Sequence, residues 1–116
     1  MNIIFKENLQ NIPEKYTVLD LDTFLMPDGS THTACCLVEN IPITELSQTE
    51  HFKELHANLI KNYGIKDWSY CEQALEHLRG KWGGELDSYY ADLQTRIAHL
   101  KTQNLDSNWS PLIIKN

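Results

Sequence analysis

The amino-acid sequence predicts an α+β fold, in which an N-terminal antiparallel β-hairpin, or a sheet of three strands, is followed by three amphipathic helices. Three features predict it. Two runs of β-branched and aromatic residues flank a turn signal within residues 16–43, three apolar stripes at helical spacing occupy residues 48–103, and glycines separate the stripes. The length of 116 residues fits one domain, 1–116, with a tail over 104–116.

The predicted hairpin joins the runs YTVLDLDTFL and THTACCLVENI. The segment Pro27-Asp28-Gly29 between them is typical of a turn, because proline presets φ, aspartate bonds to nearby backbone and glycine tolerates positive φ. An apolar run at residues 3–5 can supply a short third strand or a docked arm. Alternate residues of the first run share one face of the strand: Leu19, Leu21, Thr23 and Leu25.

Three helices are predicted in the second part of the chain. The first, at about 48–63, begins at a capping box over Ser47–Glu50 and ends at Gly64 in the left-handed conformation. The second follows an N-cap at Asp67 and ends before Gly80, and the third begins near Gly84-Glu85. The apolar positions expected to face inward are Phe52, Leu55, Leu59, Ile60 and Tyr63; Trp68, Cys71, Ala74, Leu75 and Leu78; and Leu86, Tyr89, Tyr90, Leu93, Ile97 and Leu100.

Composition narrows the functional classes. With 16 acidic and 10 basic residues the net charge is −6, which disfavours binding to nucleic acid or to anionic membrane surfaces. No run approaches the length of a membrane span, and the N-terminal apolar run is too short for a signal-peptide core, so we expect a cytoplasmic protein. Three cysteines, two of them adjacent, make a poor disulfide framework.

No motif predicts a catalytic residue, a metal site or a cofactor. Buried cysteines acting as small hydrophobic residues and histidines on wet faces explain these residue types more simply than ligation. A metal site formed by His32, Cys71 and His77 stays conceivable, as does a carboxylate pair at Asp20 and Asp22. The sequence therefore favours a non-enzymatic protein over an enzyme.

One segment suggests a ligand site, the glycine-rich turn from Arg79 to Glu85. It places two cations, an indole and three glycines ahead of a helix N-terminus, where free backbone N–H groups can receive an anion. The expected binding residues are Arg79, Lys81, Trp82, Gly83 and Gly84. A glycine-rich turn with Trp82 buried is the alternative explanation, and Glu85 would repel an anion.

Residues 55–78 resemble a single helical hairpin of the tetratricopeptide type, through Asp67-Trp68 at the turn and Cys71, Leu75 and Leu78 beyond it. No second repeat follows and the early Trp and Gly positions of that pattern are absent, so we interpret the likeness as convergent packing. The segments LDTF, PDGS, CLVENIPI, LHANLIKNY, CEQALEHL and GKWGGELDSYY also resemble a group of small uncharacterised proteins of marine tailed phages. That resemblance implies a phage accessory or host-interaction protein in the host cytoplasm.

Two partner hypotheses follow. Three tryptophans and several tyrosines favour a protein-interaction module with an unidentified protein partner, because these residue types dominate interface energies. A small sheet also leaves an edge to be covered, by the arm, by the tail or by a second copy. We therefore expect a homo-oligomer, most simply a twofold dimer.

Overall fold

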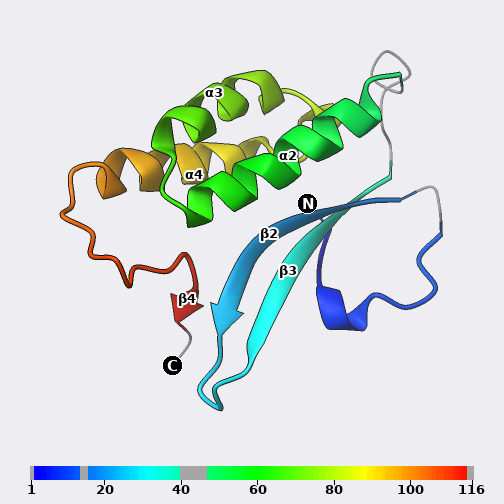
Figure 1. Cartoon of the computed structure of the whole chain (residues 1–116). Helices are drawn as coiled ribbons and strands as arrows, with labels where there is room; N and C mark the ends of the chain where they lie inside the picture. Colours follow the sequence, from blue (N-terminus) through cyan, green and yellow to red (C-terminus); the bar gives the residue numbers. More distant parts are fainter. Residues whose placement is uncertain (1, 14–15, 40–46, 115–116) are drawn as a thin grey trace. The chain divides into compact units, whose positions relative to one another are not determined.

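The computed structural model describes residues 2–13, 16–39 and 47–114. These residues fall into two compact units (Figure 1). One lies within Met1–Glu39 and Pro111–Asn116 and contains the sheet, and the other lies within Asn40–Ser110 and contains the helices. The predicted α+β class is confirmed, and the two units are described separately below. The organisation of residues 1–116 as a single domain stays a prediction.

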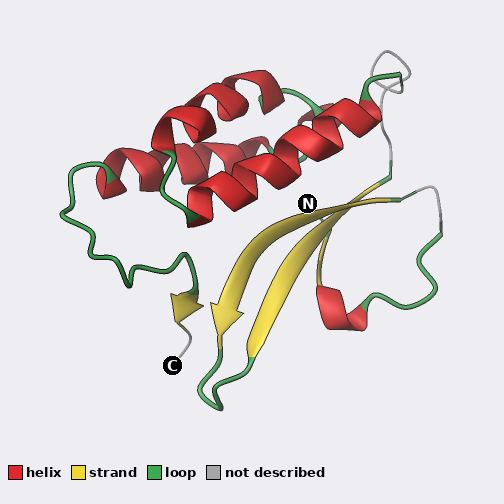
Figure 2. Cartoon of the chain, viewed as in Figure 1, coloured by secondary structure: helices red, strands yellow, loops and turns green. Residues whose placement is uncertain are grey.

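The sheet has four strands in the order β1-β3-β2-β4 (Figure 2). Strands β1 (Ile3–Phe5) and β2 (Thr17–Leu25) both pair antiparallel with β3 (Thr31–Val38), whereas β4 (Ile113–Ile114) pairs parallel with β2. The predicted hairpin is thus present as β2–β3, and residues 3–5 supply the third strand. The fourth strand comes from the tail, which was one of the alternatives expected to cover an edge of the sheet. Residues 40–43 of the predicted hairpin lie outside the described residues.

The hairpin turn forms as its residues predict. Gly29 has φ +90°, and its backbone N–H donates to the carbonyl of Met26 at 3.0 Å. One carboxylate oxygen of Asp28 accepts both the backbone N–H of Ser30 at 2.9 Å and the Ser30 hydroxyl at 2.6 Å. These bonds lower the pKa of Asp28, the hydroxyl bond being the largest cause.

The predicted face of β2 is wrong in its second half, because the strand contains a bulge. Asp20 pairs with Cys35 but Thr23 pairs with Thr33, so β2 advances three residues where β3 advances two. The extra residue turns the remainder of β2 over. Thr23 therefore lies on the face of Asp20, opposite Leu19, and its hydroxyl is 2.9 Å from that of Thr33.

The helical unit contains three α-helices close to the predicted positions: α2 (Thr49–Gly64), α3 (Trp68–Leu78) and α4 (Asp87–Leu100). Asp67 caps α3 as predicted, accepting the backbone N–H of Tyr70 at 3.2 Å. Gly80 has φ +81° just after α3, again as predicted. Within the unit α2 packs against α3, and α3 packs against α4.

Both predicted ends of α2 need correction. The N-cap position falls on Gln48, whose side chain makes no capping bond, and not on Ser47. Gly64 is the last helical residue, and the left-handed residue is Lys66 at φ +66°. The bonds from Asp67 N–H to Asn62 carbonyl and from Lys66 N–H to Tyr63 carbonyl form a Schellman motif around Lys66.

The core of the helical unit uses most of the predicted apolar positions. Its fully or nearly buried residues are Phe52, Leu59, Tyr63, Cys71, Ala74, Leu75, Leu78, Trp82, Leu86, Tyr89, Tyr90, Leu93 and Ile97. Trp68 and Trp109 are half-buried and contact each other and Tyr63, with ring centroids 5.8–5.9 Å apart. Most of the aromatic side chains that suggested an interaction surface are therefore packed internally. Among the described residues, no helix has the length and apolar character needed to cross a membrane.

Candidate functional site

The helical unit has an open hollow of about 520 Å³ between the start of α2 and the end of α3. Its lining comes from three short segments, which contribute Gln48, His51 and Phe52; Glu76 and His77; and Arg79 and Lys81. The connection between α2 and α3 spans only residues 65–67, so the helices run antiparallel. The first turn of α2 therefore lies beside the last turn of α3.

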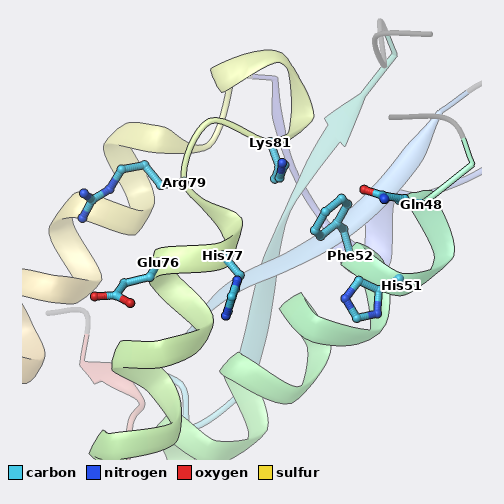
Figure 3. A pocket seen from close by; sticks show the side chains of 7 residues that line it. All are labelled: Gln48, His51, Phe52, Glu76, His77, Arg79 and Lys81. Atoms are coloured by element: carbon cyan, nitrogen blue, oxygen red, sulfur yellow. The ribbon is translucent and has the colours of Figure 1, made fainter. Parts of the chain in front are cut away.

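The lining is richer in cationic and hydrogen-bond-donating groups than in acidic ones. Figure 3 shows Lys81, His77, Phe52 and Gln48 directed toward the space between the two helices, whereas Arg79 and Glu76 are directed away from it. The carboxylate that could oppose an anion is thus turned aside. Because the chain as a whole carries −6, this local concentration of donors differs from the average surface.

Within this group, Lys81 packs over the ring of Phe52. Its Nζ lies 5.0 Å from the ring centroid of Phe52, a cation–π contact with a ring that is almost fully buried. Arg79 is differently engaged, since its guanidinium donates to the Gln94 side chain on α4 at 2.9 Å. Lys81 is therefore the cation available to a bound group, and Arg79 borders the hollow.

Of the five predicted site residues, two line the hollow and three do not. Arg79 and Lys81 belong to the lining, but Trp82 is 2% exposed and faces the core, and neither Gly83 nor Gly84 belongs to it. At the start of α4, the position predicted for an anion, the protein supplies a carboxylate of its own. There the Asp87 carboxylate accepts the backbone N–H of Gly80 at 2.8 Å.

A buried hydrogen-bonded chain lies next to the hollow. The Trp82 indole donates to the Tyr90 hydroxyl at 3.0 Å, and that hydroxyl is 3.0 Å from His56 Nδ1. His56 is 1% exposed, so the expectation that the histidines occupy wet faces is wrong for this residue. The hydrogen bond to Tyr90 explains how an imidazole is accommodated in the core.

A second polar cluster lies at the hairpin turn of the other unit. Ser30 Oγ is 3.0 Å from His32 Nε2, and the other ring nitrogen of His32 contacts the Glu7 carboxylate. The arrangement Ser30–His32–Glu7 resembles the serine–histidine–carboxylate triad that activates a nucleophilic serine. Here, however, the hydroxyl hydrogen of Ser30 is donated to Asp28. The serine oxygen consequently accepts from His32. The cluster connects the turn after β1 to the hairpin and does not activate Ser30.

The cysteines are poor candidates for chemistry. Cys71 is fully buried and its thiol lies 3.7 Å from the Leu59 carbonyl, as the prediction that it belongs to the core requires. Burial raises the pKa of Cys71 to about 11, and burial together with the Asp20 carboxylate raises that of Cys35 to about 11. Over the part of the chain that the structure describes, no three His, Cys, Asp or Glu side chains are grouped to hold a metal ion.

Sequence reasoning missed five of the lining residues: Gln48, His51, Phe52, Glu76 and His77. The sequence did contain a pattern that could have identified part of this lining. Two helices joined by a short turn place the first turn of one beside the last turn of the other, and each of these turns contains a histidine. Considering each helix separately concealed that pairing.

We compared the chain with known proteins, and no protein-family model, curated protein or solved structure matches it.

Proposed function

We propose that this protein binds a small anionic ligand, or an anionic group of a larger one, in the hollow between α2 and α3. The observation that supports the proposal is the convergence of Lys81, His77 and Gln48 beside the buried ring of Phe52, with Glu76 turned away. The volume of about 520 Å³ lies in the range of small-molecule sites. The proposal moves the site from the glycine-rich turn to the helical hairpin and keeps Arg79 and Lys81.

The donor set suits a phosphate group. Lysine binds phosphate as a point charge, while imidazole N–H groups and the glutamine amide supply directional hydrogen bonds to its oxygens. His51 and His77 are both exposed, so a ligand can reach them from solvent. Inorganic phosphate and pyrophosphate are therefore suitable first probes.

Calorimetric titration with pyrophosphate, at an ionic strength held constant with sodium chloride, tests the proposal. We expect saturable binding that Lys81→Ala weakens by about tenfold, which corresponds to one charge-assisted contact of about 1.4 kcal/mol. Lys61→Ala is the matched control, because Lys61 is exposed on α2, lies outside the lining and carries the same charge. Absence of binding, or an equal loss in both variants, would contradict the proposal.

A protein-interaction module that forms a homodimer is the second candidate, supported by the edge of the sheet. Strand β1 pairs with β3 on one side, and no other described strand pairs with it. Ile3 on this edge is 55% exposed. In such a dimer, β1 of one copy would pair with β1 of the other across a twofold axis. This pairing would cover the edge and the Ile3 side chain of each copy.

Sedimentation over a series of concentrations tests this second proposal. A dimer would have twice the 13.5 kDa mass of the monomer, and Ile3→Lys should return it to the monomer because a charge on an edge strand opposes pairing. Ile65→Lys makes the same chemical change at an exposed isoleucine of the helical unit and should leave the mass unchanged. A monomeric wild-type protein throughout the series would exclude the dimer.

A further inference from the structure

The turn that carries Lys81 has an unusual backbone. Gly80, Trp82, Gly83 and Gly84 have φ values of +81°, +57°, +64° and +80°, while Lys81 has φ −76°. Left-handed backbone is unfavourable for an L-residue, which is why glycine is usual there. Three of the four left-handed positions follow this rule, and Trp82 does not.

The side chain of Trp82 explains why the strain persists. The indole is almost fully buried, and its N–H donates to the Tyr90 hydroxyl at 3.0 Å. An indole N–H can only donate, so the Tyr90 oxygen accepts it, and the same hydroxyl is 3.0 Å from His56 Nδ1. Burial and this bond hold Trp82 in a conformation that its backbone disfavours.

Both ends of this hydrogen-bonded chain lie close in sequence to residues that line the hollow. Trp82 directly follows Lys81, and His56 follows Phe52 by four residues, on the same face of α2. Lys81 and Phe52 are the two residues in cation–π contact. The hydrogen-bonded chain therefore connects, behind the hollow, the two side chains that meet inside it.

We infer that Tyr90 is a positioning residue for the anion site: it holds Trp82 in the left-handed conformation and thereby directs Lys81 over Phe52 and into the hollow. This inference rests on the proposed anion-binding function. Tyr90 lies on α4, its ring is 2% exposed and it does not line the hollow, so it acts through Lys81 and does not contact the ligand. A free Lys81 side chain would lose entropy on binding that a preoriented one has already lost.

A double-mutant cycle on pyrophosphate binding tests this inference. The four proteins are the wild type, Tyr90→Phe, Lys81→Ala and the double variant, each titrated well below its unfolding temperature. Tyr90→Phe removes only the hydroxyl, and we expect it to raise Kd about fivefold, the effect of one neutral hydrogen bond. In the Lys81→Ala background the same change should leave Kd unaltered, because the tyrosine no longer has a lysine to position.

Two further variants separate positioning from stability. Ile97→Val trims a fully buried side chain on the same helix, so it should destabilise the unit without altering Kd. Trp82→Phe removes the indole donor from the other side of the bond and should reproduce the Kd of Tyr90→Phe, which preserves the test if the tyrosine variant does not fold.

The outcomes distinguish a failure of the proposed anion binding from a failure of the positioning role of Tyr90. If the wild type binds no pyrophosphate, the proposed function fails and the inference fails with it. Binding by the wild type with an unchanged Kd in Tyr90→Phe, or an effect equally large in the Lys81→Ala background, would overturn the positioning role alone. A parallel weakening in Ile97→Val would show that the effect reports stability.

Discussion

Replacing Lys66 by glycine should stabilise the helical unit, although the substitution deletes a long side chain and a hydrogen bond. Lys66 follows the C-cap of α2 with φ +66°, and its Nζ donates to the Asp106 carbonyl at 3.2 Å in an exposed contact. The prediction tests whether left-handed backbone strains an L-residue, the rule applied above to Trp82, at a position whose side chain is not buried in the core.

The expected magnitude follows from three contributions. Glycine relieves left-handed strain of about 1–2 kcal/mol but loses about 0.5–1 kcal/mol more backbone entropy on folding. The exposed bond from Lys66 contributes a few tenths of a kcal/mol. The net gain is about 0.5 kcal/mol, or about 2 °C in Tm for a chain of this length.

Urea unfolding followed by circular dichroism measures this difference, with two glycine variants for comparison. Ala57→Gly, at an exposed position inside α2, should cost about 1 kcal/mol because the backbone there is helical. Trp82→Gly also relieves a positive φ but should cost roughly 3 kcal/mol, because it deletes a buried indole and its hydrogen bond. A Lys66→Gly protein less stable than the wild type would refute the reasoning.

Three other predictions concern titration and packing. Because burial raises the pKa of Cys71 from 9.0 to about 11, the folded protein keeps a proton that the unfolded chain releases; the resulting stability is complete below pH 9.0 and is lost as the pH rises toward about 11. Cys71→Ala should flatten the loss of unfolding free energy over that window, and an unchanged slope would contradict it. Ser30→Ala should raise the pKa of Asp28 toward its ordinary value in a carboxyl NMR titration, since the Ser30 hydroxyl is the main group that lowers it. Trp109→Ala should cost roughly 2 kcal/mol in urea unfolding by removing a half-buried ring from Tyr63 and Trp68, and a cost near zero would show that the contact is dispensable.

The helices were predictable because their signals are local. An aspartate before an apolar stripe indicates the start of α3, and Gly80 after it accepts the left-handed backbone that ends the helix. The end of α2 shows the limit of that rule, since the Schellman bonds place Lys66, not Gly64, in the left-handed position. One extra helical residue was enough to move the stop past the glycine.

The bulge in β2 is a second limit. Period two assigned Thr23 to the face of Leu19, and the register with β3 places it on the opposite face. A bulge adds a single residue, and only the pairing partner reveals which one is extra. The hydroxyl contact between Thr23 and Thr33 depends on that register.

By itself the sequence determined the α+β class, the hairpin turn and the three helices, because capping, turn chemistry and apolar spacing act over a few residues. Tertiary structure decided which residues meet. It brought His51 and His77 to one hollow with Lys81, buried Trp82 against Tyr90 and His56, and added the tail to the sheet as β4. These contacts join residues far apart in the chain, and the free energy that selects them depends on burial and packing that no local pattern encodes.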